Sequence, residues 1–259
     1  MVLALAVAAT PLAAQMPTPA TVPADSARAK AADRLAAVIA PDSDAPMVVE
    51  ALLKGMVAQL LREDPEMADM EAEFPGLFKA LTDAWRPILL KVARAARPQF
   101  RAELSLLYQA NLTADEANEA ADFLSQPDVS GYFAAVRSEV DFSVTLRDAM
   151  GDGAVRPASL RADVAQASAK SANYLTPELE QKLSTFFGSP VGRKLIALNP
   201  RKAEIEARWA NYSAPGSENE IEIATFEAML GHIAKTDPKL ATAMRKQLEA
   251  NGNLPKPPR

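Results

Sequence analysis

Residues 46–61 read PMVVEALLKGMVAQLL, and this stretch shows the fold class most clearly. Two neighbouring rows of apolar residues run through it at a spacing of four: Val48, Leu52, Met56, Leu60 and Val49, Leu53, Val57, Leu61. A broad apolar stripe of this kind is typical of a helix that faces a protein core. Asp44 is the expected N-cap, and Pro46 falls in the first turn, where its missing N–H does no harm.

Helical periodicity continues along most of the chain. Residues 74–111 follow it, although Pro87 and Pro98 should kink or break the helix there. Residues 217–235 follow it again, and Asp237 with Pro238 opens a last helix that should end near Asn251. Alternating β-branched runs are absent from the sequence. We therefore expect an all-α array or bundle of about ten helices with no β-sheet.

Composition excludes several kinds of chemistry. The chain has 259 residues, 49% of them hydrophobic, and a net charge of −5. An acidic chain lacks the basic face with which a nucleic-acid-binding protein neutralises phosphates. The absence of cysteine excludes disulfides and thiolate sites, and the single histidine, His232, excludes a zinc site built from several imidazoles of one chain. We expect no cofactor, no metal and no nucleic-acid partner.

The two ends of the sequence differ from the rest. Residues 1–14 form an apolar run with the length of a signal-peptide hydrophobic region, although no Lys or Arg precedes it. Residues 15–25 are a proline-rich linker, and residues 252–259 should form a disordered tail because prolines interrupt any helix. No later stretch approaches the roughly 20 apolar residues of a membrane span. We expect a periplasmic or secreted protein with no transmembrane anchor after signal cleavage.

Between these ends the sequence suggests two related helical halves, residues 26–150 and 151–251, with a boundary from Gly151 to Pro157. Two segments match without gaps at an offset of 63 residues (175 − 112). The first has Leu112-Thr113-Ala114-Asp115, Phe123 and Pro127; the second has Leu175-Thr176-Pro177-Glu178, Phe186 and Pro190. Each threonine is suited to N-cap a helix, and Thr113 can form a capping box with Glu116.

The second segment is the better preserved and predicts a helix, a sharp break and another helix. Gly188 can end the first helix in a left-handed conformation, Ser189 can cap the second, and Pro190 can occupy its first turn. Gly192 has no side chain, so another helix can approach closely there. The structural motif comprises Leu175, Thr176, Glu178, Phe186, Phe187, Gly188, Ser189, Pro190 and Gly192.

These residues resemble a family of exported bacterial proteins catalogued as domain of unknown function 2059. The resemblance covers residues 175–198, with a degenerate second copy at 112–133. Phe187 stands where the family usually has tyrosine. The resemblance implies a secreted or periplasmic helical protein, and it supplies no catalytic residues.

Few residues invite a catalytic interpretation. Ser189 sits at a sharp turn but lacks a Gly-x-Ser-x-Gly elbow, and only His232 could act as an imidazole base. Two acidic runs, at 64–73 and 218–227, do not fit the calcium-loop pattern, which needs a glycine at its turn and a terminal glutamate. A partner or ligand groove is a further hypothesis, and its aromatic candidates are Trp85, Phe186, Trp209 and Tyr212.

The leading functional hypothesis is a non-enzymatic binding or scaffolding module for a protein or a small apolar ligand. One alternative is a hydrolase that uses carboxylates near His232. A second alternative is a chaperone-like protein of the cell envelope.

Overall fold

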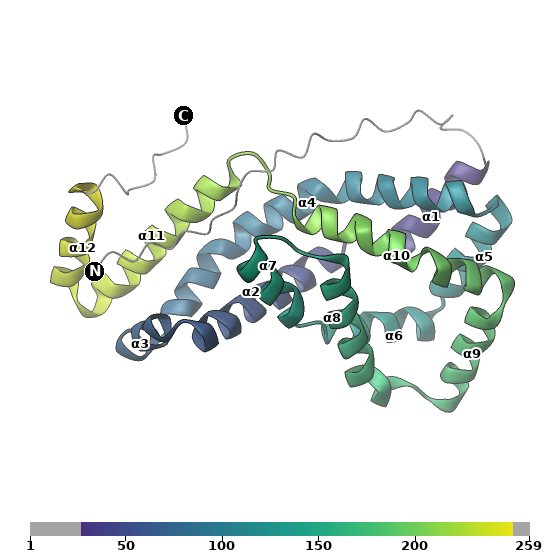
Figure 1. Cartoon of the computed structure of the whole chain (residues 1–259), viewed down its shortest axis with the longest axis horizontal. Helices are drawn as coiled ribbons and strands as arrows, with labels where there is room; N and C mark the ends of the chain where they lie inside the picture. Colours follow the sequence, from purple (N-terminus) through teal and green to yellow (C-terminus); the bar gives the residue numbers. More distant parts are fainter. Residues whose placement is uncertain (1–26, 251–259) are drawn as a thin grey trace. The chain divides into compact units, whose positions relative to one another are not determined.

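The computed structural model describes residues 27–250, and helices make up almost all of this part (Figure 1). These residues form 12 α-helices and one short 3₁₀ helix, with no strand among them. The all-α prediction is therefore confirmed. The expected signal-like segment at 1–14, linker at 15–25 and tail at 252–259 lie outside the described residues.

The chain forms two compact units that are interleaved in sequence. Of the described residues, the first unit contains 27–41 and Gln99–Tyr212, and the second contains Asp42–Pro98 and 213–250. The boundary expected between Gly151 and Pro157 instead joins two helices inside the first unit. A glycine- and proline-rich loop marks where a helix ends, but the packing of distant helices decides which of them share a core.

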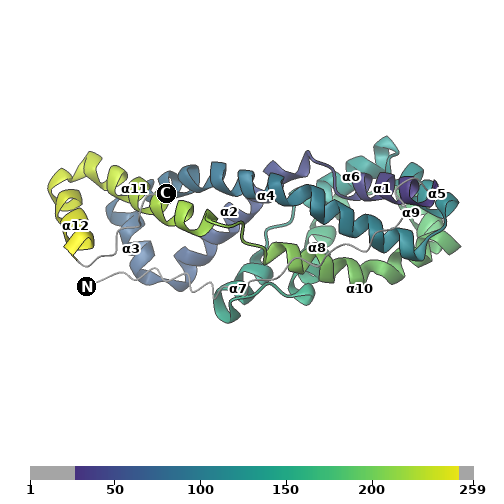
Figure 2. The same cartoon turned by 90° about the horizontal axis from the view of Figure 1, so that it is seen from above.

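The second unit consists of α2 (Asp44–Glu63), α3 (Pro65–Glu73), the part of α4 (Leu77–Asn111) up to Pro98, α11 (Ser217–Thr236) and α12 (Pro238–Ala250). Figure 2 shows α12 following directly on α11. Its core buries these side chains: Val49, Leu53, Met67, Phe74, Leu77, Phe78, Leu81, Trp85, Ile233 and Ala241. Two of the apolar residues predicted to face the core, Val49 and Leu53, do so.

Two expectations about the ends and interiors of these helices need correction. Ser43, not Asp44, occupies the N-cap position of α2. The carboxylate of Asp44 is buried and lies 3.9 Å from the guanidinium of Arg97 on α4. Helix α4 also continues unbroken through Pro87 and Pro98. Each proline removes one backbone hydrogen bond, and buried neighbours such as Trp85 and Leu104 supply packing that offsets this loss.

The first unit contains the remainder of α4 and eight further elements. They are α1 (Ala27–Ile39), α5 (Ala114–Leu124), α6 (Pro127–Ser138), α7 (Ser143–Asp152), α8 (Pro157–Lys170), the 3₁₀ helix η1 (Ser171–Tyr174), α9 (Pro177–Gly188) and α10 (Pro190–Ala210). Among the described residues, no helix is long and apolar enough to cross a membrane.

Helices α1 and α5 lie against each other through small side chains (Figure 2). The buried alanines are Ala29, Ala31, Ala32 and Ala36 on α1 and Ala117, Ala120 and Ala121 on α5. Methyl side chains let two helix backbones approach closely, so α1 covers one side of α5. The opposite side of α5 remains available to contact α9 and α10, where the repeat motif lies.

Candidate functional site

The sequence repeat is also a repeat of structure. Helix α5 begins at Ala114 and α9 at the equivalent residue, Pro177. The next helices begin at Pro127 and Pro190, which are also equivalent. We call the α5–α6 corner, residues 112–133, the first copy, and the α9–α10 corner, residues 175–198, the second copy. The same helix starts at an offset of 63 residues (177 − 114) show that the copies share one local architecture.

The predicted helix caps are confirmed in both copies. The backbone N–H of Glu116 donates to the hydroxyl of Thr113 at 3.2 Å, and the carboxylate of Glu116 accepts from the backbone N–H of Thr113 at 2.9 Å. These two bonds form the expected capping box. In the second copy, Thr176 accepts from the backbone N–H of Leu179 at 3.3 Å. Both copies therefore fix the start of their first helix through threonine.

The sharp corner of the second copy depends on Ser189 and Gly192. Ser189 has an extended backbone, and its hydroxyl accepts from the N–H of Gly192 at 3.1 Å. A Cβ atom on Gly192 would lie 2.1 Å from the carbonyl oxygen of Phe186. The close approach predicted at Gly192 is therefore confirmed, and its neighbour is the end of α9, the preceding helix.

Gly188 does not adopt the predicted left-handed conformation. It is the last residue of α9, and the described glycines with positive φ are Gly76, Gly153 and Gly216. The extended backbone of Ser189 ends the helix instead, and Arg193 donates a hydrogen bond to the carbonyl of Gly188. The exposed end of α9 thus needs no left-handed residue to satisfy that carbonyl.

The two copies meet through equivalent residues. The rings of Phe123 and Phe186 stack with their centroids 3.8 Å apart and an interplanar angle of 8°. Phe187 packs edge-on against both rings, at 6.2 Å from Phe123 and 5.3 Å from Phe186. A residue that contacts its own equivalent is what a two-fold relation between two copies produces. The phenylalanines at equivalent positions of the two copies therefore form the contact that joins α5 to α9.

Ion pairs join the other crossing helices of the two copies. Lys182 of α9 lies 2.6 Å from Asp128 of α6, and Lys194 of α10 lies 2.6 Å from Glu116 of α5. The pKa of Asp128 is lowered by its hydrogen bond to Lys182, and the pKa of Glu116 is lowered first by Lys194 and then by the backbone of Thr113. Both carboxylates are therefore held in their charged form.

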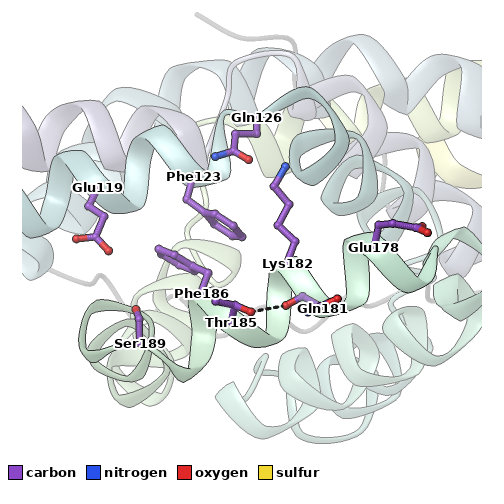
Figure 3. Close-up of a pocket in the computed structure, with 9 residues that line it drawn as sticks. All are labelled: Glu119, Phe123, Gln126, Glu178, Gln181, Lys182, Thr185, Phe186 and Ser189. Atoms are coloured by element: carbon purple, nitrogen blue, oxygen red, sulfur yellow. Dashed lines mark hydrogen bonds between the residues drawn. The ribbon is translucent and has the colours of Figure 1, made fainter.

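An open cavity of about 550 Å³ lies where the two copies meet (Figure 3). The rings of Phe123 and Phe186 lie between α5 and α9, with polar side chains around them. The lining residues are Glu119, Phe123 and Gln126 from the first copy and Glu178, Gln181, Lys182, Thr185, Phe186 and Ser189 from the second. The three residues from the first copy, Glu119, Phe123 and Gln126, are equivalent in that order to Lys182, Phe186 and Ser189, which also line the cavity.

The charge of this cavity is mainly negative. Glu119 has no ion-pair partner within the described part of the chain. The pKa of Glu178 is lowered by a backbone hydrogen bond at the start of α9 and by the hydroxyl of Thr176, so its carboxylate is anionic at neutral pH. The charge of the single lining cation, Lys182, is offset by Asp128.

The polar groups of the cavity have structural roles or lack catalytic partners. The hydroxyl of Ser189 caps α10, and the hydroxyl of Thr185 donates to the carbonyl of Gln181 at 2.8 Å. The lining holds no imidazole that could activate a serine. The cavity can therefore bind an apolar group beside charge, and it presents no nucleophile–base pair.

His232, the centre of the hydrolase hypothesis, lies in the second unit. Its Nε2 atom is 3.2 Å from the carbonyl oxygen of Pro75, and the described residues give it no carboxylate partner. The nearby acidic residue Glu71 caps α4, since its carboxylate accepts from the N–H groups of Gly76 and Phe78 at 2.8 and 2.9 Å. Within residues 27–250 no cluster of three or more metal-binding side chains forms.

The four aromatic candidates for a groove do not lie together. Trp85 is buried in the second unit, and its Nε1 donates to the hydroxyl of Thr225 at 2.8 Å. Trp209 and Tyr212 contact each other at the end of α10, with centroids 5.3 Å apart, and neither lines the cavity. Phe186 alone belongs to it. Aromatic side chains at helical spacing mostly pack into the core nearest to their own helix, which explains why these four residues do not line one groove.

Sequence reasoning missed several lining residues: Glu119, Gln126, Gln181, Lys182 and Thr185. The repeat held part of the signal, because Glu119 and Lys182 are equivalent positions one helical turn before the repeated phenylalanines. What the repeat could not show is that the two copies face each other.

No protein-family model, no curated protein and no solved structure matches this chain. The resemblance seen in residues 175–198 therefore stays a prediction.

Proposed function

We propose that this protein is an exported, non-enzymatic binding module that holds an apolar group of its partner in the cavity between the two copies. The observation that carries the proposal is the cavity itself. Its floor is the stacked pair of Phe123 and Phe186, one ring from each copy, and its volume of about 550 Å³ suits a side chain or a small molecule.

The surroundings of the phenylalanine pair support binding over catalysis. Both rings are held by packing, since they are 8% and 7% exposed and Phe187 fixes them from the edge. A rigid apolar floor loses little conformational entropy when a ligand binds, which favours affinity. The rim supplies carboxylates, amides and hydroxyls, which orient a ligand through hydrogen bonds and charge.

The cavity can be tested by filling it from its rim. Thr185 lines the cavity and is exposed, so Thr185→Trp should occupy the space without disturbing the buried rings. Ser184 is also exposed on α9 but does not line the cavity, so Ser184→Trp is the matched control. The probe is N-phenyl-1-naphthylamine, a neutral aromatic molecule whose fluorescence rises in an apolar site.

The wild-type protein and Ser184→Trp should both raise the fluorescence of this probe, and Thr185→Trp should not. Circular dichroism and thermal unfolding establish that all three proteins fold alike. Equal probe binding by Thr185→Trp and Ser184→Trp would overturn the proposed site.

The proposal of export rests on residues 1–14 of the sequence, whose apolar run is typical of a signal peptide. Residues 1–25 fused to alkaline phosphatase, which is active only outside the bacterial cytoplasm, should give an active enzyme. A fusion that begins at Gln15 should be inactive. Equal activity of the two fusions would refute this part of the proposal.

A further inference from the structure

The charges around the cavity are unevenly distributed. Helix α5 carries four carboxylates and no cation: Asp115, Glu116, Glu119 and Asp122. Lys194 neutralises Glu116 and Arg34 neutralises Asp122, each at 2.6 Å. Asp115 and Glu119 have no such partner among the described residues. One face of the cavity therefore keeps an excess of negative charge.

The same excess appears on the opposite helix. Helix α9 carries Glu178 and Glu180 in its first turn and Lys182 as its single cation. Lys182 extends toward the start of α6, where Asp128 accepts its hydrogen bond at 2.6 Å (Figure 3). The two lining carboxylates, Glu119 and Glu178, lie on opposite sides of the phenylalanine pair in Figure 3. Lys182 stands between the rings and Glu178 in this view, so Glu119 is the lining carboxylate nearer to the rings and Glu178 lies beyond Lys182, whose charge Asp128 offsets.

We infer that the cavity takes a basic peptide segment of a partner protein, with a hydrophobic side chain on Phe123 and Phe186 and lysine or arginine residues beside Glu119 and Glu178. The inference rests on the proposed function and adds the chemistry of the partner. Charge complementarity selects a cationic ligand, because opposite charges across an interface favour association and like charges oppose it. Anionic ligands, nucleic acids among them, would meet the excess negative charge of Glu119 and Glu178.

A peptide also fits the amides of the rim. Gln126 and Gln181 line the cavity, and the described residues give neither side-chain amide a hydrogen-bond partner. Each amide offers donors and an acceptor, which match the N–H and C=O groups of an extended peptide backbone. An apolar small molecule would leave these groups to water.

The test uses three fluorescein-labelled pentapeptides with a central phenylalanine, flanked by two lysines, two glutamines or two glutamates. Fluorescence anisotropy with the folded protein measures their affinities. The lysine peptide should bind about tenfold more tightly than the glutamine peptide, since two partly exposed ion pairs separate them. The glutamate peptide should bind most weakly. Raising the ionic strength should reduce these differences, because salt screens exposed charges.

Glu119→Gln and Glu178→Gln should each weaken binding of the lysine peptide about two- to fivefold and leave the glutamine peptide unchanged. Glu180→Gln is the control, because Glu180 is an exposed carboxylate of the same helix turn outside the cavity. Thermal unfolding of each variant separates a loss of charge from a loss of fold.

The outcomes separate the two proposals. Equal affinities for the lysine and glutamine peptides would overturn the charge inference and leave the apolar cavity in place. If no peptide binds while N-phenyl-1-naphthylamine does, the partner is not a basic peptide and this inference falls alone. If the naphthylamine also fails to bind, the proposed function falls with it.

Discussion

The two copies of the repeat begin their helices at equivalent residues but close their corners differently. In the second copy Gly192 allows the backbone of α10 to approach the end of α9. The equivalent residue of the first copy is Val129, which is fully buried. The second corner is tight because Gly192 has no side chain, whereas the first corner is filled by the buried side chain of Val129. Two corners whose helices start at equivalent residues can therefore be packed by different contacts.

A second difference concerns polarity. Glu116 of the first copy forms a capping box and an ion pair, whereas the equivalent Leu179 of the second copy is buried. The first copy therefore gains stability at this position from charge and hydrogen bonding, and the second from burial of apolar surface. Substitutions in the two copies should consequently have different effects, and in one case opposite effects.

The largest effect is expected where the copies meet. Phe123→Ala and Phe186→Ala should each lower the free energy of unfolding by about 3–5 kcal/mol, because each removes a buried ring and leaves a cavity. Urea denaturation measures both variants and the double variant. The double variant should lose less than the sum of the single losses by about 0.5–1.5 kcal/mol, the coupling typical of an aromatic pair.

Phe133→Ala offers a comparison, since Phe133 is partly buried in the same unit and its described ring contact is with Tyr132, not with the stacked pair. Its effect should add to that of Phe186→Ala. Strict additivity of Phe123→Ala and Phe186→Ala would show that the rings do not contact each other as described.

The next effect separates the two corners. Gly192→Ala should destabilise the protein by about 3 kcal/mol, because the new Cβ would meet backbone atoms that cannot move aside. Gly131→Ala in the first copy should stabilise it by about 0.5–1 kcal/mol, because Gly131 lies in helix α6 with no atom near its would-be Cβ. Thermal unfolding should thus show shifts of opposite sign. A shift of the same sign in both variants would contradict the described corner.

A smaller effect distinguishes the caps. Thr113→Ala and Thr176→Ala should each cost about 1 kcal/mol, because each leaves a helix N-terminus without its side-chain acceptor. Thr113→Ala should cost more, because the capping box joins two hydrogen bonds. The matched serine variants keep the hydroxyl and should be close to wild type in urea denaturation. A larger loss of stability for Thr176→Ala than for Thr113→Ala would contradict this prediction.

The smallest effect is the pH dependence of stability that Glu116 contributes in the first copy. The pKa of Glu116 is lowered from its ordinary value of 4.5 by Lys194 and then by the backbone of Thr113, so folding favours its charged form. The stabilisation that the charged Glu116 carboxylate contributes is complete at pH values above its ordinary pKa of 4.5. It disappears as the pH falls through the lowered pKa of the folded state.

Glu116→Gln should therefore be less stable than wild type by under about 1 kcal/mol at pH 7 and should match it at low pH. Urea denaturation between pH 7 and pH 3 measures the difference. Glu180→Gln removes an exposed carboxylate with no described ion pair and is the matched control for the loss of one negative charge. A constant difference between Glu116→Gln and wild type across this range would show that the ion pair contributes nothing.

Local sequence signals predicted much of the fold. The apolar rows of α2, the threonine caps and the serine–proline start of α10 all involve residues within a few positions of one another. The prediction for Gly188 failed because of nearby residues, Ser189 and Arg193, whereas the prediction for Asp44 failed because of a distant one. Asp44 pairs with Arg97 of α4, which is far from it along the chain and on another helix.

The candidate site was only partly predictable for the same reason. The repeat identified Phe186 and Ser189 as motif residues and Phe123 as the equivalent of Phe186, but it did not single out Gln126, the residue equivalent to Ser189. Trp85, Trp209 and Tyr212 were aromatic candidates by residue type alone, and the structure places them in other environments. Residue type indicates what a side chain could bind but does not say what it packs against.

The sequence by itself determined the helical class, the caps and the existence of two related corners, because backbone hydrogen bonding and amphipathic periodicity act over a few residues. Only the tertiary structure decided that α1 joins α5, that the compact units interleave, and that Phe123 stacks on Phe186. These features arise from burying apolar surface between segments far apart in the chain, and the periodicity of a single helix does not specify which other helix will cover it.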